Sequence, residues 1–202
     1  MTIDLPYSAA CERNQQPILQ VITPYLQKAK TVLEVGSGTA QHAVFFAKAY
    51  PELIWQTADQ EHYLAGIHAQ LKAANLKNML SPIELDVNRS DWNTAKQKFD
   101  VVYTANTLHI MSDQEVQAFF KGLPTVCDLQ ALLVIYGPFK YSDQFTSQSN
   151  QDFDQSLRSR GEGSCIKDFE EIERLANQQG FELLLDQTMP ANNQCLIWQK
   201  KR

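Results

Sequence analysis

The sequence has 202 residues, of which 44% are hydrophobic and 20% charged, which is typical of one globular domain and excludes a second full-sized one. Eighteen Lys and Arg against 23 Asp and Glu give a formal net charge of -5, so the chain lacks the basic surplus of proteins that bind long nucleic acids. Its apolar runs are far shorter than the roughly 20 residues that cross a bilayer. Because the first residues show no basic start and no apolar signal core, we expect a cytoplasmic protein.

The cysteines and histidines do not predict a metal site. Wide spacing excludes a Cys-x-x-Cys pair, so we expect reduced thiols at all four cysteines: Cys11, Cys127, Cys165 and Cys195. His62 and His68 are six residues apart and do not share a helix face.

Short apolar runs alternate with longer amphipathic stretches, which is the pattern of strands separated by helices in a mostly parallel sheet. The predicted fold class is therefore α/β, in a single domain. Seven strands are predicted, over residues 31–35, 53–58, 80–85, 99–104, 131–136, 181–186 and 195–199. Helices are predicted over residues 15–28, 39–50, 61–74, 113–127 and 167–179.

The C-terminal third departs from simple alternation. Only about eight residues separate the last two strands, too few for a helical crossover, so we expect an antiparallel hairpin. Between residues 138 and 164 the chain becomes polar with scattered aromatic residues, and a short helix is predicted over 149–160. We interpret 138–164 as a lid-like insertion, and residues 1–30 as an N-terminal cap and helix.

A loop with two glycines follows the first strand, in the order Gly36-Ser37-Gly38 after Glu34. Glycines let the backbone approach a ligand closely, and the next helix offers free amide groups at its N-terminus. Ligands of open α/β sheets bind beyond the carboxyl ends of the strands, where this loop is expected. The loop therefore predicts a ligand site.

The residues around this loop favour S-adenosylmethionine. A dinucleotide fingerprint would place its third glycine at position 41, where this chain has Gln41, and Glu34 would repel a pyrophosphate but attract a sulfonium and an ammonium. Asp59 ends the second strand, where it can accept hydrogen bonds from both ribose hydroxyls. Asp86 ends the third, where it can accept from the adenine amino group. Each acid alone also fits a solvated strand end; together they favour this ligand.

Four phrases of the chain resemble a known family: SAACERNQQPIL from Ser8, VGSGTAQHA from Val35, YGPF from Tyr136 and MPANN from Met189. They resemble class I S-adenosylmethionine-dependent methyltransferases, and more closely the methyltransferase-like 26 family. The resemblance implies a Rossmann-like sheet of six parallel strands with an antiparallel seventh, and methyl transfer with S-adenosylhomocysteine as product. It implies no particular acceptor. The family usually has glycine where this chain has Ala40.

From the glycine loop, the acids and this resemblance we expect ten residues to bind the cofactor: Arg13, Glu34, Gly36, Ser37, Gly38, Asp59, Gln60, Asp86, Val87 and Asn106. Arg13 lies in the family's N-terminal phrase and would meet the methionine carboxylate with its planar fork; a surface turn is the alternative.

Asn106 and His109 follow the fourth strand, beside the expected methyl donor, and are the candidate catalytic residues. An ordinary histidine pKa near 6.5 suits a general base, and some small-molecule O-methyltransferases resemble this chain in having His just after the corresponding strand. A packing or capping role for His109 is the alternative. The segment lacks the Asn-Pro-Pro-Tyr type of sequence used on nucleic-acid bases.

The loops after the fifth strand and inside the hairpin should face the same edge, so the candidate substrate residues are Tyr136, Phe139, Asn192 and Asn193. The two asparagines also suit turns with positive φ. The predicted function is in-line methyl transfer from S-adenosylmethionine to a small polar acceptor. The alternatives are a non-catalytic sensor or partner module that binds S-adenosylmethionine, and a nicotinamide-dependent reductase; the oligomeric state stays open.

Overall fold

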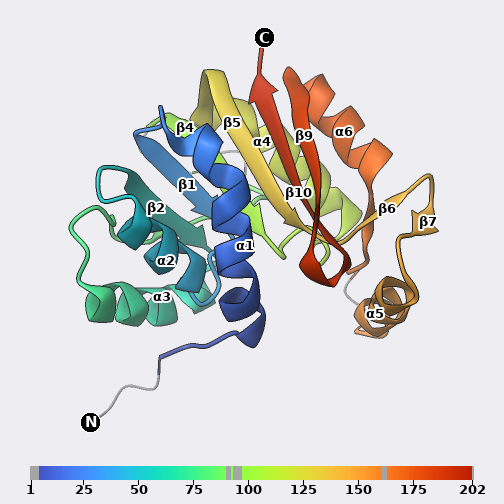
Figure 1. The fold of residues 1–202 in the computed structure, drawn as a ribbon, viewed down its shortest axis with the longest axis horizontal. Helices are drawn as coiled ribbons and strands as arrows, with labels where there is room; N and C mark the ends of the chain where they lie inside the picture. The colour runs from blue at the N-terminus through green and yellow to red at the C-terminus, as the bar shows by residue number, and fades with distance from the viewer. Residues whose placement is uncertain (1–4, 90–91, 93–96, 161–162, 202) are drawn as a thin grey trace.

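The computed structural model describes residues 5–89, 92, 97–160 and 163–201, and is the structure referred to below (Figure 1). Its centre is a seven-stranded sheet in which only the C-terminal hairpin interrupts the parallel order. In spatial order the strands are β3 (Ile83–Glu84), β2 (Ile54–Asp59), β1 (Thr31–Val35), β4 (Phe99–Ala105), β5 (Cys127–Gly137), β10 (Asn193–Lys200) and β9 (Phe181–Met189). The predicted α/β class, the seven strands and the antiparallel hairpin are confirmed.

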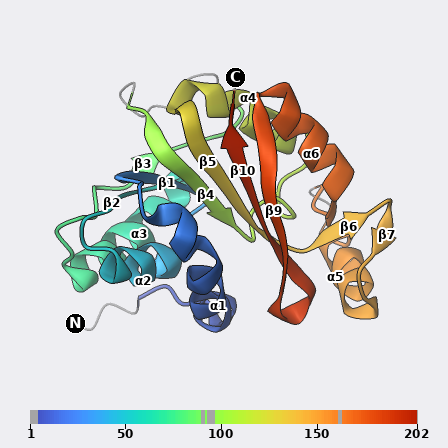
Figure 2. The same cartoon turned by 45° about the horizontal axis from the view of Figure 1, so that its top comes forward.

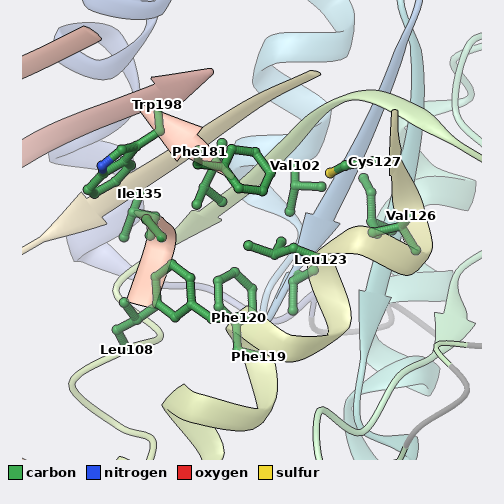
Figure 3. Packing of buried hydrophobic residues seen from close by; sticks show 14 of the residues in the cluster. Val102, Leu108, Phe119, Phe120, Leu123, Val126, Cys127, Ile135, Phe181 and Trp198 are labelled. Carbon is green, nitrogen blue, oxygen red and sulfur yellow. The ribbon is translucent and has the colours of Figure 1, made fainter. Parts of the chain in front are cut away.

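Helices cover both faces of the sheet (Figures 1 and 2). One face is packed by α1 (Ala9–Leu26), α2 (Gln41–Ala49) and α3 (Glu61–Ala74), and the other by α4 (Asp113–Val126) and α6 (Phe169–Gln178). Central strands such as β1 and β4 are buried on both faces, which explains their continuous apolar runs. Figure 3 shows side chains of α4, including Phe119, Phe120 and Leu123, directed at the strands.

Local signals explain where several helices begin. Ser112 and Glu115 form a capping box at the start of α4, with Ser112 N donating to Glu115 Oε2 over 2.7 Å. The first helix begins at Ala9, six residues before the predicted start, because Ser8 caps it: Cys11 N donates to Ser8 Oγ.

The insertion is more regular than predicted. It contains β6 (Phe139–Tyr141), β7 (Gln144–Phe145) and α5 (Gln148–Arg158), and β6 pairs with β8 (Lys167–Asp168) to complete a second, three-stranded sheet. This sheet is not predicted from the sequence because strands of two or three residues show no measurable alternation. For the same reason the helix predicted from residue 167 is wrong at its start: β8 occupies the first two positions.

The four cysteines are free, as predicted. Among the described residues no helix combines the length and apolar character of a membrane span, and no three His, Cys, Asp or Glu side chains gather into a metal site.

Candidate functional site

A cavity of about 710 Å³ lies at the carboxyl ends of β1, β2, β3 and β4. Eight of the ten expected cofactor residues line it: Glu34, Gly36, Ser37, Gly38, Asp59, Gln60, Val87 and Asn106. The topology explains this gathering, since parallel strands bring their carboxyl ends to one edge. The volume is within the range of small-molecule and cofactor sites, about 300–1,000 Å³.

The glycine loop is held in a conformation that side chains rarely adopt. Gly36 and Gly38 have φ of 73° and 52°. A Cβ at Gly36 would lie 2.7 Å from the side chain of Thr107 in the loop after β4, whereas a Cβ at Gly38 would meet nothing within 4 Å. Gly36 therefore allows two loops to touch, and Gly38 borders open space in the cavity.

Ala40 also has a left-handed conformation, with φ of 57° and ψ of 14°. It is fully buried at the N-cap of α2 and forms no side-chain cap. An L-residue in this conformation costs roughly 1–2 kcal/mol, which accounts for the glycine usual here in the family that the sequence resembles.

Asp59 connects the end of β2 to the glycine loop. Its Oδ2 accepts a hydrogen bond from Gly38 N over 2.7 Å, and its Oδ1 accepts one from Gln60 N over 2.8 Å. Burial raises the pKa of Asp59, while the two backbone donors act in the opposite direction. The carboxylate still has lone pairs available for a ligand.

Glu34 is a buried acid at the floor of the cavity. Its side chain accepts a hydrogen bond from Trp55 Nε1 over 2.8 Å. Burial raises the pKa of Glu34 to about 8, the Trp55 bond opposes this, and the charge of Asp59 adds to it. At neutral pH the group is therefore mostly a neutral acid, and a nearby cation would favour its ionised form.

Two expected cofactor residues lie outside the cavity lining. Arg13 is exposed on α1, and Ser8 and Cys11 of the same segment line the cavity instead. Asp86 accepts a hydrogen bond from Asn88 N over 2.9 Å at its Oδ1, and its neighbours Leu85 and Val87 line the cavity.

Further lining residues were not predicted. They come from the start of α3 and from the segment before α4, and include His62, Tyr63, Thr107, Ile110 and Met111. None of these positions has a local sequence signal, since each depends on the packing of distant segments.

A chain of buried hydrogen bonds runs from the cavity wall toward the hairpin. Tyr103 OH lies 3.0 Å from His42 Nδ1, and His42 Nε2 lies 2.6 Å from Asn14 Oδ1. Burial lowers the pKa of His42 to about 4. The ring is therefore neutral, and because Asn14 Oδ1 only accepts, His42 donates to it and accepts from Tyr103. The Tyr136 hydroxyl is hydrogen-bonded to the side chains of Asn14 and Asn193.

Of the two candidate catalytic residues, Asn106 lines the cavity and His109 does not. Asn106 lines the cavity in a left-handed conformation, with φ of 57°, and its N donates to Tyr136 O over 2.8 Å. His109 lies behind the lining; its ring contacts Phe153 of α5 edge-on at 5.3 Å. Burial first, then the charges of Lys167 and Arg160, lower the pKa of His109 to about 4.

The candidate substrate residues are mostly engaged within the protein. Phe139 is buried in the core, and the Tyr136 hydroxyl bonds to two asparagines. Asn192 has φ of 56° in the hairpin turn, and its Nδ2 donates to Ser149 Oγ of α5 over 3.0 Å. The turn role that the sequence also allowed therefore describes Asn192. Asn193 Nδ2 donates to Pro190 O over 3.2 Å.

The two loop glycines should respond differently to alanine. Gly36→Ala adds strain and a clash with Thr107, so we expect a loss of about 2–4 kcal/mol in the free energy of unfolding. Gly38→Ala adds strain alone, about 1–2 kcal/mol at most. Urea denaturation of both variants at one pH measures the difference, and equal losses would contradict the close approach of the two loops.

Glu34 should make stability depend on pH. Its pKa is about 8 in the folded protein against an ordinary 4.5, so its contribution is fully present below about pH 4.5 and is lost as the pH rises through about 8. Glu34→Gln removes this dependence, and above pH 8 the variant should be the more stable by a few kcal/mol. Urea denaturation from pH 5 to 9 tests this, with exposed Glu84→Gln as control. Parallel curves for wild type and Glu34→Gln would show that Glu34 does not titrate as described.

Several solved structures that resemble this chain are methyltransferases. An O-methyltransferase family protein from Burkholderia thailandensis matches with a TM-score of 0.83 at 17% identity, over 95% of this chain and 57% of that one. Human N-acetylserotonin methyltransferase in complex with S-adenosylmethionine gives 0.81 at 13%, over 96% and 53%. PigF with S-adenosylhomocysteine gives 0.74 at 13%, over 92% and 57%.

The chain thus spans little more than half the length of these proteins, and the likeness shows a shared fold, the Rossmann-like class I methyltransferase fold. A family model described as "Protein of unknown function (DUF938)" matches residues 5–200. Because the match covers nearly the whole chain, the protein belongs to the DUF938 family.

Proposed function

We propose that this protein is an S-adenosylmethionine-dependent methyltransferase of a small polar acceptor, of the methyltransferase-like 26 type that its phrases resemble. The observation that carries the proposal is the cavity in which Glu34 and Asp59 flank the glycine loop. The neighbours with S-adenosylmethionine and S-adenosylhomocysteine support the choice of cofactor. The net charge of -5 supports a small acceptor over long nucleic acid, and we propose a cytoplasmic location.

The residues present fit this cofactor. Gly38 borders open space, so a ligand can approach its backbone closely. Glu34, mostly neutral at pH 7, would ionise beside a sulfonium or ammonium, which makes cation binding and proton release from Glu34 linked events. Asp59, already fixed by two backbone amides, would accept hydrogen bonds from ribose hydroxyls.

When bound, the cofactor supplies an activated methyl carbon, to which the acceptor oxygen or nitrogen bonds as the carbon–sulfur bond breaks and a proton leaves the acceptor. The protein's part is alignment and water exclusion. Asn106 would position the acceptor at the cavity wall, and the 138–164 insertion would act as the lid of a single domain. His109, which is neutral at pH 7, would be the group that takes the acceptor proton.

One observation favours a second candidate function. His109 lies outside the cavity lining and has a pKa of about 4, well below the value that suits a base near neutral pH. A sensor or partner module that binds S-adenosylmethionine without turnover would need no such base. Consumption of the methyl donor in the presence of a metabolite extract separates the two functions, because a sensor releases the donor intact.

Asp59→Asn should weaken cofactor binding. The loss of a charged acceptor for hydroxyl donors corresponds to roughly a 10- to 100-fold rise in dissociation constant. Calorimetric titration with S-adenosylmethionine and with S-adenosylhomocysteine measures this, with Asp128→Asn at the opposite end of the sheet as control. If the wild-type protein gave no heat with either compound at millimolar concentration, the proposed function would be wrong.

His109→Asn should lower turnover by about 10²- to 10⁴-fold if His109 is the base, with cofactor binding unchanged. Since the pKa of His109 is about 4, the wild-type rate should rise as the pH increases through about 4. Above pH 5 His109 is already deprotonated, so it should cause no further change in rate. The measurement is the transfer of labelled methyl to an acceptor from pH 3.5 to 8, with the exposed His68→Asn as control. Unchanged turnover in His109→Asn would assign His109 a packing role.

A further inference from the structure

The buried carboxamide of Gln194 on β10 has an unpaired end. Its side chain is 7% exposed, and its Oε1 has no hydrogen-bond partner among the residues that the structure describes. Burying an amide oxygen without a partner is unfavourable. Gln56 on β2 shows the ordinary solution: it is equally buried, and its Nε2 donates to Thr57 O over 2.9 Å and to Ser81 O over 2.7 Å.

Gln194 lies beside the candidate base. It pairs with Gly137 across the antiparallel β10 and β5, so its side chain lies on the face to which a Gly137 side chain would point. A Cβ at Gly137 would lie 3.8 Å from His109 Nδ1. Because directly opposed Cβ positions are about 4.5–5.5 Å apart, the Gln194 side chain and the His109 imidazole both lie close to the position that a Gly137 side chain would occupy.

The insertion completes this region. Phe153 of α5 contacts the His109 ring and is 36% exposed. The start of α5 is held to the end of the hairpin by Asn150 Nδ2, which donates to Asn192 O over 2.9 Å. Both segments lie at the same edge of the molecule, next to each other in Figure 2. An imidazole, an unpaired carboxamide and a phenyl ring thus come from three separate elements, β10, α5 and the loop after β4.

We propose that Gln194 is the residue that recognises the acceptor. Its Oε1 accepts a hydrogen bond from a hydroxyl or amine of the acceptor, next to the atom that is methylated. The acceptor is therefore a small molecule with a second protic group close to its nucleophile. This inference rests on the proposed methyltransferase function and specifies its substrate class.

The first test is stability. Gln194→Met keeps the approximate size and removes the unpaired oxygen, so Tm should rise by about 2–4 °C. Gln56→Met is the matched control: it removes two satisfied hydrogen bonds, and its Tm should fall. If Gln194→Met lowered Tm as Gln56→Met does, the carboxamide would be a structural group and the proposal would be overturned.

The second test is methyl transfer from tritiated S-adenosylmethionine to a small-molecule cell extract, with S-adenosylhomocysteine affinity measured in parallel. Gln194→Met should form at least tenfold less labelled product and bind S-adenosylhomocysteine within twofold of wild type. Equal product from variant and wild type would overturn the role of Gln194 alone. A wild-type protein that binds S-adenosylhomocysteine but labels nothing would instead overturn the proposed function, and this inference with it.

Discussion

The hydrogen bonds of Asp59 to the backbone determine the shape of the cavity. One carboxylate receives Gly38 N from the loop after β1 and Gln60 N from the start of α3, so it fixes two neighbouring segments at once. The positive φ of Gly36 and Gly38 needs such support, because glycine loses more backbone entropy than any other residue when it is ordered. Every other contact proposed for a ligand depends on this loop being in place.

Glu34 adds a second acid without adding a second full charge. Its burial against Trp55 and its proximity to Asp59 both favour the neutral form. The neutral form of Glu34 therefore avoids placing a second full negative charge in the cavity, and Glu34 can become negatively charged when a cation arrives. The three acids predicted from the sequence thus have different roles. Asp59 holds the glycine loop, Glu34 can change its charge, and Asp86 accepts a hydrogen bond within its own turn.

How much could be predicted from the sequence depends on the range of the interactions. Apolar runs located β1, β2 and β4 to within about a residue because burial on both faces is a local signal. The strands of two or three residues in the insertion are too short to produce such a local signal. On α1, the buried positions Asn14, Ile18, Ile22 and Leu26 follow a four-residue spacing that leaves Arg13 on the exposed side. Because the predicted helix starts near residue 15, the spacing from Asn14 onward does not extend back to Arg13 in the sequence. In the structure Ser8 and Cys11 line the cavity, and Arg13 does not.

Tyr136 and Gly137 are neighbours in sequence, yet they face opposite sides of the sheet. The polar groups on the two sides differ in their hydrogen bonding. On the α1 side the Asn14 side chain is hydrogen-bonded both to the Tyr136 hydroxyl and to His42. On the α4 side Gln194 Oε1 finds no partner within the described part of the chain, and it lies beside the position that a Gly137 side chain would occupy next to His109. A closed network needs no further partner and suits a rigid wall, whereas an unpaired buried group lowers stability, and a bound molecule that hydrogen-bonds to it would offset that cost. The asymmetry therefore favours the α4 side as the direction from which an acceptor meets the cofactor cavity.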